Sequence, residues 1–494
     1  MIRLTLLLAI TLFFTLYVWK DWYTSLCALI VLMAFVHHPD MPRTMLGVQG
    51  LDPWNVLFFA IVIAWFSQRI SKRLPWDMPR SVTVLLLVNF AVLVIGFLGL
   101  VVDKHSLPYE TSIAGLTSEY LFNPVKWAFG GLLLFDGCRS RRRLLVGLAS
   151  LLLLYFFLGL QVAKWVSPGE LNGMELSSYT LRRLDQEIGY HRNDLSTMLA
   201  GASWAILALR PLAASAKLRW GIVTAALIVL YAQALTAGRG GYLAWCTVGL
   251  TLGLLRWRRY LVLVPLMIIV IVSLFPAVGE RALLGIEPNS PTASDNMSDE
   301  TGLDEFTAGR TVIWPRVIEE SLRAPLFGHG RLSFRRTGLA AEWSGPESDD
   351  PVGAEHPHSA YLEMLLDGGV IGLLAALSLY GYLLSAGFSL VRDRRSPVFL
   401  AVGGIALSLI LAQLVGSLTG QSFYPHEATV GMWGAIGLLL RVSVQRSRVS
   451  AESRHRTRHG RAAGAAQANL WPRPPISASG IRTHEPWWQS RSSP

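Results

Sequence analysis

Three residues in short motifs have side chains suited to an anionic, phosphate-containing substrate. Arg239 lies in TAGRGGYL and Arg310 in AGRTVIWPRV. A guanidinium group can bind phosphate oxygens through two parallel hydrogen bonds. His358 lies in EHPHSAYLEMLLDGGVIGLL, and a neutral histidine is the usual general base near neutral pH. The three side chains together favour a site that binds an anion and accepts a proton.

Each motif supports this chemistry locally, and each also has a plainer explanation. Glycines around Arg239 allow a backbone or a phosphate to approach closely. The plainer explanation is that Arg239 lies in a tight turn and its side chain reaches the membrane surface. Arg310 lies at the start of a predicted helix, whose backbone N–H groups would help to bind an anion. The plainer explanation is that Arg310 is a surface residue. Pro357 suits the first position of a helix. His358 would then lie in the first turn, where the helix dipole keeps its ring neutral; alternatively it forms a hydrogen bond at an interface.

A metal site is the remaining alternative for the histidine motif. His356 and His358 form a His-x-His pair, but no third ligand with clear spacing accompanies them, and a zinc site needs three or four. The sequence therefore predicts neither a metal nor a cofactor. The three cysteines, Cys27, Cys138 and Cys246, lie in apolar runs or a basic loop and suggest no disulfide framework.

The elements that carry these motifs are predicted to be membrane-spanning helices. Of the 494 residues, 52% are hydrophobic and 16% are charged, whereas soluble domains carry about 25% charged residues. A spanning helix needs about 20 mostly apolar residues, and about thirteen segments approach that length. The predicted spans are Leu4–Trp19, Ser25–Val36, Trp54–Phe66, Val82–Val102, Leu121–Phe135, Leu144–Val162, Leu195–Leu209, Leu218–Leu235, Tyr242–Leu255, Tyr260–Phe275, Gly368–Ala386, Val398–Ser417 and Ala428–Val442.

Positive charge orients these spans. The basic segments fall on one side if the spans alternate, and the positive-inside rule makes that side the cytoplasm. They are Gln68–Arg80, Cys138–Arg143, Arg210–Arg219, Arg256–Arg259, Arg392–Arg395 and the tail after Arg441. The net charge of +11 is thereby explained without nucleic acid as a partner. The odd number of spans places the N-terminus outside, and no signal-peptide cleavage site follows the first span.

One outer loop, Phe275–Pro357, has about 80 residues, far more than the usual connection of roughly 4–6. Within it, Thr311–Arg323 has the pattern of an amphipathic helix, with Ile313, Trp314, Val317 and Leu322 on its apolar face. The predicted organisation is all-α, a polytopic bundle of about 12–14 spans. It comprises N-terminal helices (1–193), helices with the Arg239 turn (194–275), the large periplasmic loop (276–357), C-terminal helices (358–443) and a basic, disordered cytoplasmic tail (444–494).

In motif and order, the stretch from Asp194 to Leu440 resembles the O-antigen ligase and polymerase family of bacterial envelope proteins. TAGRGGYL is similar to the family's Ser-Arg-Gly turn, with Gly238 in place of the usual serine. GRTVIWPRVIEESLRAPLFGHG resembles its loop helix and the Pro-Leu-x-Gly-x-Gly segment that follows. HPHSAYLEMLLDGGVIGLL resembles its His-Asn-x-Tyr-Leu signature with Gly-x-x-Gly, with Ser359 in place of asparagine.

The resemblance implies a metal-independent transferase of the bacterial inner membrane whose active site faces the periplasm. It would move a glycan from undecaprenyl pyrophosphate to an acceptor hydroxyl: lipid A–core in a ligase, another lipid-linked glycan in a polymerase, or a protein hydroxyl in related enzymes. His358 would be the base, and Arg239 and Arg310 would hold the pyrophosphate. A transporter is the alternative from another class, but the sequence shows no internal repeat, and its notable ionisable residues lie at the outer edge rather than at the midplane.

Overall fold

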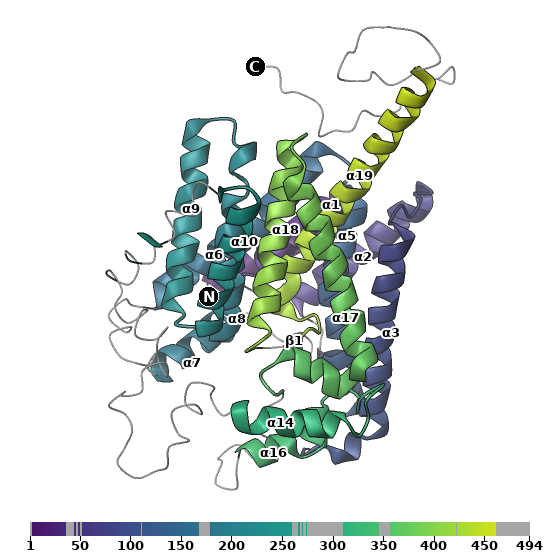
Figure 1. The fold of residues 1–494 in the computed structure, drawn as a ribbon, viewed down its shortest axis with the longest axis vertical. Coiled ribbons are helices and arrows are strands. Elements are labelled where there is room, and N and C mark those ends of the chain that lie inside the picture. The colour runs from purple at the N-terminus through teal and green to yellow at the C-terminus, as the bar shows by residue number, and fades with distance from the viewer. Residues whose placement is uncertain are drawn as a thin grey trace.

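Long apolar helices packed side by side make up most of the computed structural model (Figure 1). It describes residues 2–35, 44–45, 48–49, 52–109, 111–166, 178–258, 310–344, 356–420 and 422–460, with single positions at 265, 266, 269 and 273. The long helices are α1 (Ile2–Leu32), α2 (Pro53–Ser71), α3 (Arg80–Val102), α5 (Asn123–Gly137), α6 (Arg141–Trp165), α8 (Arg192–Leu207), α9 (Ala216–Leu235), α10 (Arg239–Leu255), α17 (Ala360–Arg392), α18 (Pro397–Gly416) and α19 (Val430–Gly460).

Short elements connect these helices. Among the described residues the strands are β1 (Thr44–Met45) and β2 (Val48–Gln49), an antiparallel pair in which Thr44 lies opposite Gln49. The short helical elements are η1 (Lys104–Ser106), α4 (Ile113–Leu116), the π-helix η2 (Thr117–Phe122), α7 (Ser178–Glu187), η4 (Arg210–Leu212), α14 (Arg310–Ser321), α15 (Ser333–Arg336), α16 (Leu339–Ser344) and η6 (Glu427–Thr429). The predicted all-α class is therefore confirmed.

Side-chain caps and prolines set where several spans begin. The Asp52 carboxylate accepts a hydrogen bond from the Asn55 N–H at 2.8 Å, and Pro53 is the first residue of α2. Ser140 caps α6, Ser215 caps α9 and Ser396 caps α18 in the same manner. These groups satisfy helix N–H donors that have no partner within the helix.

Helix α1 consists of two antiparallel halves. Asp21 has non-helical backbone angles (φ −152°, ψ 88°), and the Ser25 hydroxyl donates a hydrogen bond to the Phe14 carbonyl at 3.0 Å. Residues eleven apart in a straight helix are about 16 Å apart, so the chain must reverse at Asp21. The two predicted spans Leu4–Trp19 and Ser25–Val36 correspond to these halves.

Nine helices in the described part of the chain are long and apolar enough to cross a membrane. Helices α5 and α10 are shorter, with 15 and 17 residues, and pack within the same bundle. Every predicted span except Tyr260–Phe275 coincides with one of these helical segments, and most of that span lies outside the described residues. Helix α19 continues to Gly460, so the first part of the predicted tail is helical; residues 461–494 also lie outside the described residues.

Small residues let the helices approach closely, as is common between membrane helices. A Cβ added at Gly131 of α5 would overlap the carbonyl of Trp433 in α19, and one added at Gly437 would overlap Gly131. Helix α18 packs against α8, α10, α17 and α19, and most of its residues are buried. Many residues on α3 and the first half of α1 remain exposed and apolar, including Leu12, Leu87 and Leu98.

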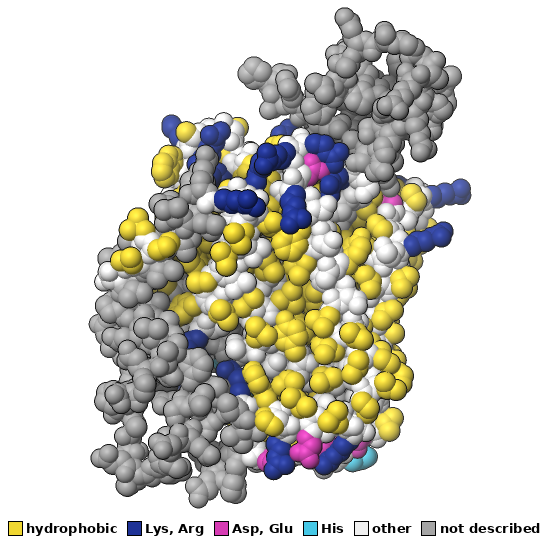
Figure 2. Space-filling model, viewed as in Figure 1, with side chains coloured by type: hydrophobic (Ala, Val, Ile, Leu, Met, Phe, Trp, Pro, Cys, Tyr) yellow, Lys and Arg dark blue, Asp and Glu magenta, His cyan; other side chains and the backbone are white. Residues whose placement is uncertain are grey.

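The two ends of the bundle differ in charge and cover. At one end, here called the basic end, arginines pair with buried or half-buried carboxylates: Arg69 with Asp136 at 2.6 Å, Arg143 with Asp21 at 3.0 Å, and Arg441 with Asp77 at 2.7 Å. Figure 2 shows Lys and Arg side chains gathered at this end, above a broad hydrophobic face. The opposite end, here called the loop end, is covered by α14 and α16 (Figure 1).

The predicted amphipathic helix of the long loop is α14. Its Ile313 and Val317 are buried in a small cluster with Phe334, Leu339 and Leu366, and Trp314 packs against that cluster. Leu322, which was expected on the same apolar face, is 70% exposed. That part of the prediction is wrong because Leu322 follows Val317 by five residues, which turns its side chain about 140° round the helix. Ser321, four residues after Val317, is the residue that continues the buried face.

Candidate active site

The turn that carries Arg239 lies at the loop end, between α9 and α10. Ala237 has a left-handed backbone (φ 52°), and α10 begins at Arg239. The Ser196 hydroxyl of α8 donates to the Gly238 carbonyl at 3.0 Å, and a Cβ on Gly241 would overlap that hydroxyl. The glycines therefore let α8 approach the turn, and this fixes where Arg239 leaves the bundle.

Arg310, the first residue of α14, lies next to the same turn. Its Nη2 donates to the carbonyl of Thr419 at 3.0 Å, and a Cβ on Gly240 would lie 2.7 Å from Thr419 Oγ1. The buried Nε of Arg310 has no hydrogen-bond partner, and the described residues provide no carboxylate that pairs with this arginine. Burial and the positive charge of Arg239 lower the pKa of Arg310. Two neighbouring guanidinium groups therefore repel each other, and an anion between them would relieve that repulsion.

His358 is held in a strained conformation beside α14. Its backbone is left-handed (φ 51°), which is rare for a residue with a side chain and marks functional sites more often than chance. The Trp314 Nε1 donates to the Pro357 carbonyl at 3.0 Å. The ring centroid of His358 lies 5.0 Å from that of Trp343 and 4.9 Å from that of His356, both edge-to-face.

The predicted start of the following helix is wrong. The helix begins at Ala360 with Ser359 as its N-cap residue, so Pro357 is not the first helical residue and His358 lies outside the first turn. The left-handed backbone at His358 interrupts any continuous helix from Pro357. The pKa of His358 is lowered to about 3, so the ring stays neutral. Burial, not the helix dipole, is the largest cause, and His356, Arg310 and His191 contribute the rest.

The structure thus brings together the three residues that the sequence analysis selected. The positive charge of Arg239 lowers the pKa of Arg310, and that of Arg310 lowers the pKa of His358. They come from three separate places in the chain: the start of α10, the start of α14 and the segment before α17. His191, which the sequence analysis missed, joins this group from the N-cap position of α8.

Residues 223–377 match the family model described as O-Antigen ligase. This stretch resembles the O-antigen ligase family and is here called the O-antigen ligase region. It begins within α9, contains Arg239, Arg310 and His358, and ends within α17. A comparison with individual curated proteins finds no match. The match supports an enzyme of the glycosyltransferase-like ligase or polymerase type, in agreement with the multi-pass helical fold.

In the O-antigen ligase region, the Pro-Leu-x-Gly-x-Gly segment (residues 325–330) and the Gly-x-x-Gly segment (residues 369–372) lie side by side. Backbone hydrogen bonds join the first segment to residues 366–371, and this arrangement is here called the backbone clip. The His329 N–H donates to the Leu366 carbonyl at 2.8 Å, and the Val370 N–H donates to the Pro325 carbonyl at 2.9 Å. Gly369 has φ 62° and ψ −167°, and a Cβ there would overlap the backbone of Leu326. The Pro-Leu-x-Gly-x-Gly segment is therefore joined by backbone hydrogen bonds to α17 at its kink, which lies at Gly369. This clip holds the loop helices against the helix that follows His358.

A buried ion network next to the clip also escaped the sequence analysis. Arg331 Nη1 lies 2.6 Å from Glu363 Oε1 and 3.1 Å from Asp367 Oδ2. Its guanidinium carbon lies 3.7 Å from the ring centroid of Tyr424, and Asp367 also accepts hydrogen bonds from the backbone and hydroxyl of Ser333. Removal of one partner from such a buried pair is strongly destabilising. We interpret the network as support for the loop end; the only sequence signal for it is two carboxylates four residues apart on a helix.

The departures from the family's motifs have structural counterparts. A Cβ on Gly238 would lie 2.5 Å from the Ser196 Cβ, so this turn has no room for the family's usual serine unless α8 moves. Ser359 is buried and its side chain makes no capping hydrogen bond. In the described part of the chain, no three His, Cys, Asp or Glu side chains are grouped so that they could hold a metal ion.

Proposed function

We propose that this protein transfers a glycan from undecaprenyl pyrophosphate to an acceptor hydroxyl of lipid A–core, at the periplasmic face of the bacterial inner membrane. The observation that supports this most strongly is the convergence of Arg239, Arg310 and His358 at the loop end of the bundle. Two adjacent cations suit a multiply charged pyrophosphate, and a neutral imidazole beside them suits a hydroxyl that must lose its proton.

In the proposed reaction, Arg239 and Arg310 bind the pyrophosphate before and during the transfer. The acceptor oxygen attacks the anomeric carbon of the glycan while the bond from that carbon to the phosphate oxygen breaks. The leaving lipid pyrophosphate takes the bonding electrons, and preorganised cations stabilise the charge that develops there. His358 accepts the proton of the acceptor hydroxyl, which removes positive charge from the attacking oxygen.

The surroundings of the site support an amphiphilic donor. Apolar helices below the loop end provide a face for the lipid. Helices α14 and α16 cover that end and carry exposed charged side chains, among them Arg316, Glu319 and Glu342. The arginines of the basic end lie on the opposite side of the bundle. The positive-inside rule then favours a periplasmic position for the site.

A transfer assay with purified protein in lipid tests this function. With a glycan on undecaprenyl pyrophosphate and lipid A–core as substrates, we expect a ligated product and free undecaprenyl pyrophosphate. Product that forms only when a second lipid-linked glycan replaces lipid A–core would identify a polymerase of the same family. In cells, deletion with accumulation of lipid-linked polymer indicates a ligase, whereas accumulation of single repeat units indicates a polymerase.

We also expect the reaction to need no metal, because the His356–His358 pair has no evident third ligand. Addition of a chelator to the same assay should leave the rate unchanged. Loss of activity that a divalent ion restores would contradict this part of the proposal.

A further inference from the structure

At the basic end, far from the candidate active site, we infer that a groove along α17 and α19 binds an anionic phospholipid. The lipid phosphate would lie between Arg392 and Arg446, and an acyl chain would extend along α17 toward Gly381. This inference does not depend on the proposed transfer reaction.

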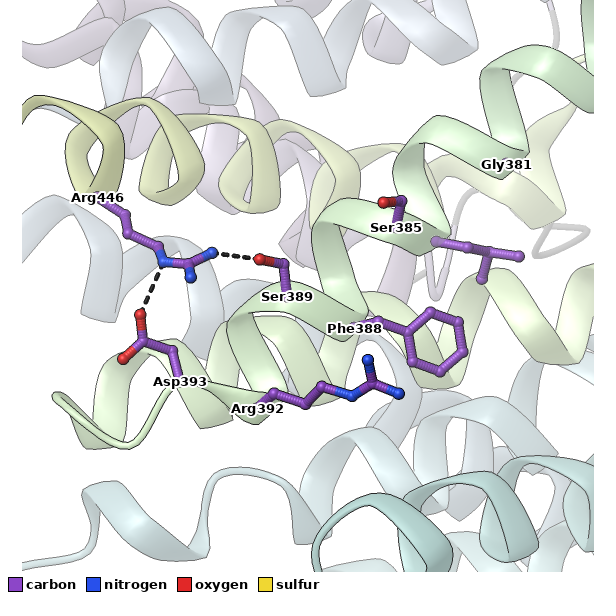
Figure 3. Close-up of a pocket in the computed structure, with 8 residues that line it drawn as sticks. Gly381, Ser385, Phe388, Ser389, Arg392, Asp393 and Arg446 are labelled. Atoms are coloured by element: carbon purple, nitrogen blue, oxygen red, sulfur yellow. Dashed lines mark hydrogen bonds and ion pairs between the residues drawn. The ribbon is translucent and has the colours of Figure 1, made fainter. Parts of the chain in front are cut away.

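The groove is a cavity of about 640 Å³. Figure 3 shows that its residues on α17 follow one another along a single helical face, and that Arg446 of α19 reaches toward them from the other side. The lining consists of Gly381, Leu384, Ser385, Phe388, Ser389, Arg392, Asp393 and Arg446. Its charged groups thus lie toward one end, and Gly381 and Leu384 lie toward the other.

The polar end of the groove carries excess positive charge. Arg446 Nε lies 2.7 Å from Asp393 Oδ2, and its Nη1 donates to the Ser389 hydroxyl. The same carboxylate also pairs with Arg395 at 2.5 Å. Asp393 therefore already serves two arginines. In the described part of the chain, exposed Arg392 has neither a hydrogen-bond nor an ion-pair partner, so its charge is available to an anion.

The apolar end has the length and openness that an acyl chain needs. No heavy atom lies within 4 Å of a Cβ added at Gly381, and Ser385 is exposed. Gly381 and Arg392 are eleven residues apart, about 16 Å along a helix. That is roughly half of a 30 Å hydrocarbon core, the depth of one leaflet.

These features select a lipid over a soluble anion. A free phosphate would use the arginines alone, whereas a phospholipid also covers Leu384, Phe388 and the open face at Gly381. Basic pockets between membrane helices bind anionic headgroups by this combination. The bilayer also presents such lipids to the groove at high local concentration.

Native mass spectrometry of the full-length protein in detergent, titrated with phosphatidylglycerol or phosphatidylcholine, tests the inference. We expect tighter binding of phosphatidylglycerol. Arg392→Gln should weaken that binding about five-fold, since a basic residue near an anionic lipid contributes about 1 kcal/mol. Gly381→Leu should also weaken it by filling the groove, although it leaves every charge in place. Arg394→Gln, which removes an exposed charge outside the groove, is the matched control and should leave binding unchanged.

Three results would overturn the inference. Equal weakening by Arg394→Gln and Arg392→Gln would mean that general surface charge attracts the lipid. Displacement of the lipid by inorganic phosphate at matched concentration would assign the groove to a free anion. A change in oligomeric mass in Gly381→Leu, without a change in lipid binding, would assign it to a second copy of the chain.

Discussion

At the residue scale, His358 combines a left-handed backbone, a half-buried ring and a cationic neighbour, Arg310. Each of these costs free energy, and strain of this kind persists where the surrounding structure enforces it. The hydrogen bond from Trp314 to the Pro357 carbonyl and the edge-to-face contact of His358 with Trp343 hold the histidine in this conformation. The histidine is therefore positioned by the loop helices, not by the helix that follows it.

The pH dependence of the reaction should reflect this environment. In the free protein the pKa of His358 is about 3, so the ring is neutral and able to accept a proton throughout the physiological range. A bound pyrophosphate near Arg310 offsets the repulsion that lowers this pKa, and should raise it. We therefore expect the ascending limb of kcat/KM, which reports the free enzyme, at lower pH than that of kcat, which reports the complex. A kcat/KM limb near 6.5, the ordinary pKa of histidine, would contradict this.

The sequence alone could identify the three candidate residues because each lies in a local motif with a recognisable residue type. It could not identify His191 or Arg331. His191 approaches His358 only when α8 packs against the rest of the bundle, and Arg331 finds Glu363 and Asp367 only when the loop folds onto α17. Such contacts depend on tertiary packing, which no local pattern encodes.

At the element scale, hydropathy was sufficient to find the spans that lie in the described residues. These include the two halves of α1, because Lys20 and Asp21 interrupt its apolar run. Hydropathy failed at the start of α17. There the proline rule favours a helix from Pro357, but tertiary hydrogen bonding holds Pro357 in the loop and the helix begins three residues later.

The backbone clip gives a prediction for a single glycine. Gly369→Ala should destabilise the protein by about 1–3 kcal/mol, since the residue occupies a backbone region that is essentially restricted to glycine and a Cβ would overlap Leu326. Thermal unfolding in detergent measures the change. Gly381→Ala on the same helix is the matched control: its backbone is helical and its surroundings are open, so it should be neutral or stabilising. Equal stability of the two variants would rule out the structural role of the clip.

At the scale of the whole molecule, the bundle separates its charges between two ends. Arginines paired with Asp136, Asp77 and Asp393 lie at the basic end, and the candidate active site lies at the loop end. The predicted domain division at residues 193, 275, 357 and 443 remains a prediction, as does the side on which each end lies.

Reporter fusions test that orientation. We expect a phosphatase fused at Ser298, in the long loop, to be active and one fused at Arg394, at the basic end, to be inactive, because the positive-inside rule places the arginines in the cytoplasm. Fusions of a cytoplasm-specific reporter at the same positions provide the control and should give the opposite pattern. The reverse result would move the candidate active site to the cytoplasmic face.

The most direct test of the account separates donor binding from turnover in purified protein reconstituted in lipid. His358→Ala should lower turnover about 100- to 10,000-fold, the usual effect of removing a general base, and leave binding of the lipid-pyrophosphate donor largely intact. Arg239→Ala and Arg310→Ala should weaken donor binding as well as turnover. Lysine at either position should rescue only partly, because it lacks the planar fork. Arg316→Ala, an exposed arginine on α14, is the control and should retain both properties. Loss of donor binding in His358→Ala with normal binding in both arginine variants would contradict the assigned roles, and full activity in all three would place the active site elsewhere.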